Sequence, residues 1–162
     1  MGINSIGYKF FFVLHILSVV IGFGAVFFNG RYVRMTKGAS SVESKAILDA
    51  SGFISYSRAI YFIYLVPVFG ILLIVFSNSK WSFQQTWISA TFVLWFLIIG
   101  LFHGAIRPNE KKLRNFFEQK NPSDEKDNLE LKSLYNKESL YVGLFHTMLV
   151  LAIVLMIFKP GA

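Results

Sequence analysis

Cysteine is absent from the 162-residue sequence, and acidic residues are few. Without cysteine the chain cannot form disulfide bonds, iron–sulfur clusters, thiolate metal sites or a cysteine nucleophile. Nine Asp and Glu residues stand against sixteen Lys and Arg, and none of the nine lies inside a long apolar run. Proton relays inside membranes are commonly built from acidic residues. The composition therefore argues against a solute transporter driven by such a relay.

Four apolar runs dominate the sequence and predict an integral membrane protein. The apolar fraction is 54%, above the roughly 45–50% of soluble domains. The runs lie at about residues 8–30, 58–77, 86–106 and 139–158. Each can cross about 30 Å of hydrocarbon at about 1.5 Å of rise per residue. We therefore expect a single all-α domain over residues 1–162, with four transmembrane helices.

Basic residues cluster in two of the connections between the apolar runs. Thirteen of the sixteen Lys and Arg lie in residues 31–58 and 107–138, and the other three are Lys9, Lys80 and Lys159. The positive-inside rule then predicts that both long connections are cytoplasmic and that both termini lie outside. Because this asymmetry accounts for the net charge of +7, we expect no nucleic-acid partner.

The two basic connections carry signals for short amphipathic cytoplasmic helices. Ser40 and Glu43 form a capping-box pattern, which predicts a helix over about Ser41–Ala50. Residues 109–119 have apolar positions at helical spacing among basic ones, which predicts a helix that extends the third span along the lipid head groups. Ser123 is the expected N-cap of the fourth helix.

The first half of the chain resembles the second half at a shift of 80 residues. The shift pairs Asn29 with Asn109, Arg34 with Arg114, and Tyr61 with Tyr141. Two interpretations remain open, a chance match in a biased composition or two helical hairpins of the same orientation around an axis along the membrane normal. In either case the three histidines do not follow the repeat, so a site can be asymmetric.

His15 is the first candidate for chemistry, because it is an ionisable group in a span with no formal charge between Lys9 and Arg31. By helical rise it lies roughly 10 Å below the outer membrane surface. One interpretation is an axial haem or metal ligand, with the other ring nitrogen oriented by a carbonyl or hydroxyl group. The alternative is a packed histidine hydrogen-bonded across helices.

His103 and His146 lie near the inner membrane surface, and by depth they could share a layer. This arrangement would suit a two-histidine metal site or a second haem, whereas the simpler interpretation is polar contact between helices. Arg31 lies at the same surface and could pair with haem propionates or lipid phosphates, or could only anchor the topology.

Several motifs resemble known bacterial membrane families. His15-Ile16-Leu17 with Arg31 sixteen residues later, Trp87 at the start of the third span and His103 near its end resemble the four-helix membrane protoporphyrinogen oxidase and its copper-resistance-type relatives. The Leu-His and Gly-Phe-Gly character of the first span is also similar to the domain of unknown function 2269, an uncharacterised family of four-helix membrane proteins.

The first resemblance implies a b-type haem with His15 as one axial ligand. The lysine that supplies the second ligand in the oxidase family corresponds here to Thr91, which cannot replace it. A five-coordinate haem, ligation by Met148, or loss of the cofactor would each be consistent with this difference.

Two classes of function follow for a protein of the bacterial cytoplasmic membrane. The first is a haem protein for electron transfer or porphyrinogen-type oxidation, passing electrons to a quinone or a partner complex. The second is a cofactor-free accessory or scaffold subunit of a larger membrane complex, in contact with the lipid bilayer. The sequence is also compatible with a homo-oligomer.

Overall fold

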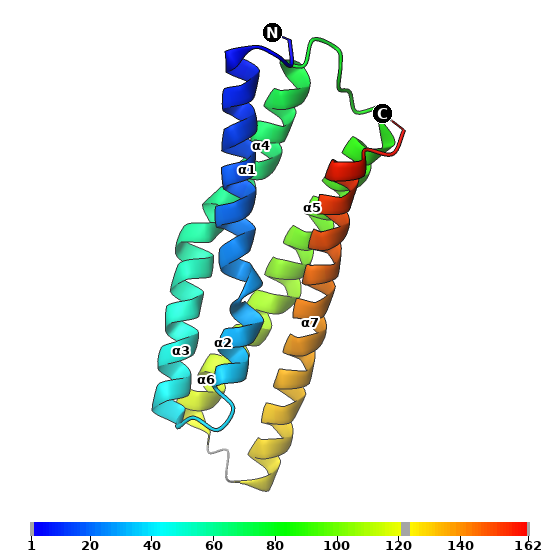
Figure 1. The fold of residues 1–162 in the computed structure, drawn as a ribbon. Coiled ribbons are helices and arrows are strands. Elements are labelled where there is room, and N and C mark those ends of the chain that lie inside the picture. The colour runs from blue at the N-terminus through cyan, green and yellow to red at the C-terminus, as the bar shows by residue number, and fades with distance from the viewer. Residues whose placement is uncertain (1, 121–123, 162) are drawn as a thin grey trace.

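The computed structural model describes residues 2–120 and 124–161, which form long helices joined by short turns (Figure 1). Two of the helical rods contain a five-residue π-helical segment, named η. In chain order the elements are α1 (Ile6–Phe27), α2 (Asn29–Met35), α3 (Ser41–Ile54), η1 (Ser55–Ala59), α4 (Ile60–Val75), α5 (Thr86–Leu101), η2 (Phe102–Ile106), α6 (Arg107–Gln119) and α7 (Glu125–Phe158).

These elements make four rods, each long and apolar enough to cross a membrane. The rods are Ile6–Met35, Ser41–Val75, Thr86–Gln119 and Glu125–Phe158, of 30, 35, 34 and 34 residues. The all-α membrane architecture expected from the four apolar runs is therefore confirmed.

The rods are longer than a bilayer requires, so the helical bundle extends beyond the hydrocarbon at one end. A rod of 34 residues is about 51 Å long, against about 30 Å of hydrocarbon. Both termini lie at one end of the bundle, which we call the terminal end; the opposite end, where α2 turns into α3, is the basic end (Figure 1). We take the charge-free stretches 10–30, 59–79, 81–106 and 139–158 as the membrane-spanning segments.

The basic end has a core of its own. Within the membrane, buried apolar side chains from all four rods pack together, with Phe23, Ile63, Phe102 and Phe145 among the largest. Beyond the membrane a second apolar cluster comprises Val33, Leu48, Leu113, Phe116, Phe117 and Leu134. Burial of these side chains by about 25 cal/mol per Å² stabilises the extension of the bundle.

The helices expected in the basic connections are confirmed, but their setting differs. Ser40 caps α3, and its side chain and Glu43 form the expected capping box. However, α3 continues through η1 into α4, and α6 continues α5 through η2, so neither helix lies along the head groups (Figure 1). Their apolar faces pack on each other instead of on lipid. The expected N-cap Ser123 lies outside the described residues.

The interior of α4 contains Pro67, and the neighbouring helices compensate for it. Proline has no N–H group, so the carbonyl of Ile63, four residues earlier, loses its helical donor. The indole N–H of Trp95 on α5 donates to this carbonyl at 3.2 Å. Gly22 on α1 approaches the same turn so closely that a Cβ there would lie 2.8 Å from the Ile63 amide nitrogen. Close packing at Gly22 and the Trp95 bond together hold α4 in place.

The two halves of the chain are arranged as the 80-residue repeat requires. Helix α1 begins at Ile6 and α5 begins at Thr86, exactly one repeat later in sequence number. Each first helix packs along the returning helix of its own hairpin, α1 on α4 and α5 on α7. Asn29 and Asn109, paired by the repeat, are both buried just below the membrane core. This arrangement favours the two-hairpin interpretation over chance.

Candidate functional site

A buried polar layer separates the membrane core from the core of the basic end. Asn29 is 1% exposed, and its amide donates to Glu110 Oε1 at 3.1 Å. The hydroxyls of Ser55 and Ser51 donate to the Asn29 side-chain oxygen at 2.8 and 3.3 Å. Because an unpaired buried amide or carboxyl group is costly, these bonds fix the layer.

Glu110 is the acidic centre of the layer. It is 3% exposed and accepts a short hydrogen bond from the hydroxyl of Tyr56. The guanidinium group of Arg107 lies over the Tyr56 ring, 5.1 Å from its centroid. Burial raises the pKa of the Glu110 carboxyl above its ordinary value, while its bonds to Tyr56 and Asn29 act in the opposite direction.

Glu138 is a second buried carboxyl group, contributed by α7. It is 2% exposed, and Asn109 donates to its Oε2 atom at 2.8 Å. Its Oε1 atom is buried and finds no hydrogen-bond partner among residues 2–120 and 124–161. Burial, followed by the charge of Glu110, raises the pKa of Glu138 to about 8. Glu138 therefore has one oxygen available for a ligand.

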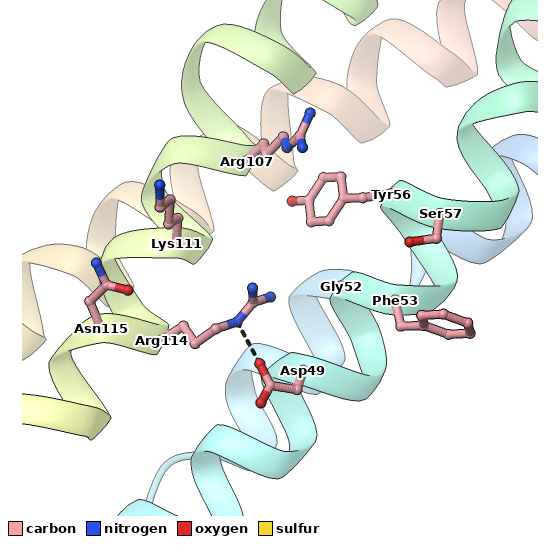
Figure 2. A pocket seen from close by; sticks show the side chains of 9 residues that line it. All are labelled: Asp49, Gly52, Phe53, Tyr56, Ser57, Arg107, Lys111, Arg114 and Asn115. Carbon is pink, nitrogen blue, oxygen red and sulfur yellow. Dashed lines mark ion pairs between the residues drawn. The ribbon is translucent and has the colours of Figure 1, made fainter.

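A basic pocket lies on one side of this layer, between α3–η1 and α6; we call it the α6 pocket. Its volume is about 480 Å³, and it is lined by Asp49, Gly52, Phe53, Tyr56, Ser57, Arg107, Lys111, Arg114 and Asn115. Figure 2 shows three cationic side chains along α6, Arg107, Lys111 and Arg114, opposite Tyr56 and Asp49. Positions 107, 111 and 114 share one face because residues three and four apart are neighbours on a helix.

The cations of the α6 pocket are not equally committed to the fold. Arg114 is held by Asp49, with Nε to Oδ1 at 2.8 Å, and donates to the Leu48 carbonyl at 3.2 Å. Arg107 lies over Tyr56. Lys111 makes no ion pair with any residue in the described part of the chain. Lys111 is therefore the cation most available to an anionic ligand.

A second basic pocket lies on the other side of the layer, between α2 and α7; we call it the α2 pocket. Its volume is about 730 Å³, and Glu138 lines it. Cationic side chains come from α2 and the turn after it, and apolar ones from the adjoining membrane segments. The full lining is Phe27, Phe28, Gly30, Arg31, Val33, Arg34, Lys37, Tyr135, Asn136, Glu138, Ser139, Val142, Gly143 and His146.

The residues expected to hold a cofactor are dispersed. His15 is 7% exposed, and its Nδ1 donates to the Val66 carbonyl on α4 at 3.0 Å. Thr91 donates to the Trp87 carbonyl one turn back on its own helix, at 2.7 Å. Met148 packs beside the membrane core. The bond to Val66 orients the His15 ring and leaves Nε2 as its second nitrogen.

The other two histidines each have a separate partner. His103 Nε2 pairs with the hydroxyl of Tyr64 at 2.7 Å. His146 Nε2 donates to the Phe27 carbonyl at 2.9 Å. The described residues contain no group of three His, Cys, Asp or Glu able to hold a metal ion. The structure thus gives these histidines interhelical hydrogen bonds, and places Arg31 in the α2 pocket.

Reasoning from the sequence missed Glu110 and Glu138 because both lie beyond the charge-free spans. A signal was present: Glu110 precedes Leu113 and Phe117 by three and seven residues, on the face that becomes buried. Glu138 likewise follows Leu134 by four residues and precedes Phe145 by seven. A carboxyl group on an otherwise apolar helical face indicates a buried polar site.

Comparison with known proteins gives one family. The family model described as "Predicted integral membrane protein (DUF2269)" matches residues 10–160. No curated protein and no solved structure matches the chain. The resemblance to the membrane protoporphyrinogen oxidase and copper-resistance group finds no support in these comparisons.

Proposed function

The chain belongs to the DUF2269 family of predicted integral membrane proteins, and from this premise we propose that it binds phosphate-bearing lipid head groups at its basic end. The ligand chemistry is a phosphate diester carried by a lipid. The membrane would be the bacterial cytoplasmic membrane, with the basic end in the cytoplasm, where anionic lipids and the excess of Lys and Arg meet.

The α6 pocket is the observation that carries this proposal. Three cations, Arg107, Lys111 and Arg114, face a pocket with a single acidic residue, Asp49. Arg107 directly follows the third charge-free span, so the pocket lies at the depth of the head groups. Basic pockets between transmembrane helices on the cytoplasmic side are typical sites for anionic head groups.

The direct test is binding of dioctanoyl phosphatidylglycerol to the purified protein in a neutral detergent. Loss of a charge-assisted hydrogen bond costs about 1.5–3 kcal/mol, so Lys111→Gln should weaken binding roughly tenfold or more. Lys112→Gln is the matched control, since Lys112 is the next residue of α6 but does not line the pocket.

Two outcomes would count against lipid binding at this site. Equal affinity of the wild type, Lys111→Gln and Lys112→Gln would show that the α6 pocket does not hold the head group. Equally strong competition by inorganic phosphate would indicate a free anion as the ligand. Little competition by phosphate supports a lipid, because the acyl chains then contribute to binding.

A haem-dependent redox function is the second candidate, and His15 supports it. Its Nδ1 is fixed on the Val66 carbonyl, the orientation that a ligating histidine uses for its non-ligating nitrogen. These residues fit a haem with one protein ligand, because the Thr91 hydroxyl is bonded to Trp87; Met148 would be a second ligand only after a rearrangement. The haem would supply electron transfer to a quinone or a partner complex.

A visible spectrum of the detergent-purified protein tests this second candidate. A Soret band that shifts on reduction with dithionite and is lost in His15→Ala would support it. A folded protein that stays colourless after haem is supplied would exclude it and favour the accessory-subunit interpretation.

A further inference from the structure

We propose that the α2 pocket is a second head-group site, related to the α6 pocket by the 80-residue repeat, and that it selects a zwitterionic phospholipid whose primary ammonium group binds Glu138. This inference deepens the proposed function and rests on it. It assigns the ligand class of a pocket on the opposite side of the polar layer.

The repeat relates the cations of the two pockets one to one. Arg31 corresponds to Lys111, and Arg34 corresponds to Arg114, each at a shift of 80 residues. All four residues line their respective pockets. The two pockets thus present the same pair of cations, three residues apart on one helix face.

The opposite walls of the two pockets are related in the same way. In the α6 pocket the cations of the second hairpin face the returning helix of the first, at Tyr56. In the α2 pocket the cations of the first hairpin face the returning helix of the second, at Asn136, which is 80 residues after Tyr56. A pseudo-twofold axis along the membrane normal therefore exchanges the pockets.

Glu138 makes the α2 pocket chemically different from its counterpart. The residue 80 positions earlier is Arg58, which does not line the α6 pocket. Glu138 lines the α2 pocket, and only one of its oxygens is bonded, to Asn109. A buried carboxyl oxygen without a partner is costly, and a donor from a ligand would remove that cost.

The arrangement of the lining matches a phospholipid with a cationic head. Phe27, Phe28 and Val142 line the pocket from membrane segments, where acyl chains lie. Arg31 and Arg34 follow the first charge-free span, at the depth of lipid phosphates. An ethanolamine head group carries three N–H donors next to its phosphate, so it can reach the arginines and Glu138 together.

The test compares two lipids that differ only in their ammonium donors. Dioctanoyl phosphatidylethanolamine has a primary ammonium group, and dioctanoyl phosphatidylcholine has a trimethylated one without N–H donors. We expect the wild type to bind the ethanolamine lipid roughly tenfold more tightly, which corresponds to about 1.4 kcal/mol. Glu138→Gln should bind both lipids equally, and Lys111→Gln should keep the wild-type preference.

The outcomes separate this inference from the proposed function. Equal binding of the two lipids by the wild type, or an undiminished preference in Glu138→Gln, would overturn the assignment of the ammonium to Glu138. A preference that depends on Glu138, together with phosphatidylglycerol binding that is insensitive to Lys111→Gln, would contradict the α6 site alone. Melting temperatures of both variants at the wild-type level or above confirm that each change is local.

Discussion

Glu110 and Glu138 are brought into one buried layer by helices that the sequence separates by a charged connection. Each carboxyl group is 3% exposed or less, and the charge of Glu110 raises the pKa of Glu138. Asn29 and Asn109 donate to one oxygen of each. The layer therefore holds two carboxyl groups that are satisfied best when they do not both carry a charge.

Replacing Glu138 by glutamine should stabilise the protein at high pH. The pKa of Glu138 is raised from 4.5 to about 8, so the folded state holds a proton that the unfolded state has released. Stability from this group is fully present below about pH 4.5 and is lost as the pH rises towards 8. Each unit of pKa corresponds to about 1.4 kcal/mol, so Glu138→Gln should gain a few kcal/mol at pH 8.

Thermal unfolding in detergent between pH 5 and pH 8.5 measures this effect. We expect the melting temperature of the wild type to fall across this range and that of Glu138→Gln to stay level. A variant that is less stable than the wild type at pH 8 would mean that the carboxylate is favourably paired in the fold.

At the residue scale, the sequence pointed to the wrong kind of residue for the polar layer. Histidines attract attention because they are ionisable groups inside apolar spans, yet His103 and His146 each bond to a nearby carbonyl or hydroxyl group. The carboxyl groups looked solvated because Lys and Arg surround them in sequence. Only the packing of α6 on α3 and α7 shows which charged residues face inward.

At the scale of single helices, α1 and α4 depend on one close approach. A Cβ at Gly22 would lie 2.8 Å from the backbone nitrogen of Ile63, whereas a Cβ at Gly24 meets nothing within 4 Å. Gly22→Ala should therefore cost about 1–3 kcal/mol by forcing the helices apart. Gly24→Ala should be neutral or stabilising by up to about 1 kcal/mol, because alanine favours the helix.

The Gly24→Ala variant is the matched control for Gly22→Ala, since both change one glycine of α1 to alanine. Melting temperatures of the two variants in the same detergent provide the comparison. Equal melting temperatures would show that α1 and α4 do not meet at Gly22.

The second element-scale prediction concerns Pro67 and Trp95. Trp95→Phe removes the donor to the Ile63 carbonyl and should cost about 1–3 kcal/mol, the penalty of an unsatisfied buried group. In a Pro67→Ala background residue 67 has its own N–H for this carbonyl. The cost of Trp95→Phe should then fall by roughly 1 kcal/mol or more. A double-mutant cycle measures the coupling, and purely additive effects would contradict the compensation.

At the scale of the whole molecule, the four spans could be predicted because lipid imposes a length and an apolar composition. The ends of the rods could not, because α2, α3 and α6 continue past the charges that end the hydropathy signal. Their stability comes from a second apolar cluster, which involves residues from three parts of the chain. Long-range packing of this kind leaves only a weak trace in local sequence patterns.

The orientation of the molecule is a separate prediction at this scale. The chain has no cysteine, so single-cysteine variants can be labelled without background. Gln84 is exposed at the terminal end, and Val42 is 81% exposed at the basic end. In intact bacteria, an impermeant maleimide should label Gln84→Cys and should label Val42→Cys only after lysis. Labelling in the reverse order would place the basic pockets outside the cell.

The central claim is that the basic end holds two lipid head groups, one in each pocket. The most direct measurement is native mass spectrometry of the protein released from its membrane in mild detergent, counting retained phospholipids. We predict two for the wild type, one for Lys111→Gln and one for a variant that combines Arg31→Gln with Arg34→Gln. A wild type that retains no phospholipid, or a count unchanged in both variants, would contradict the account.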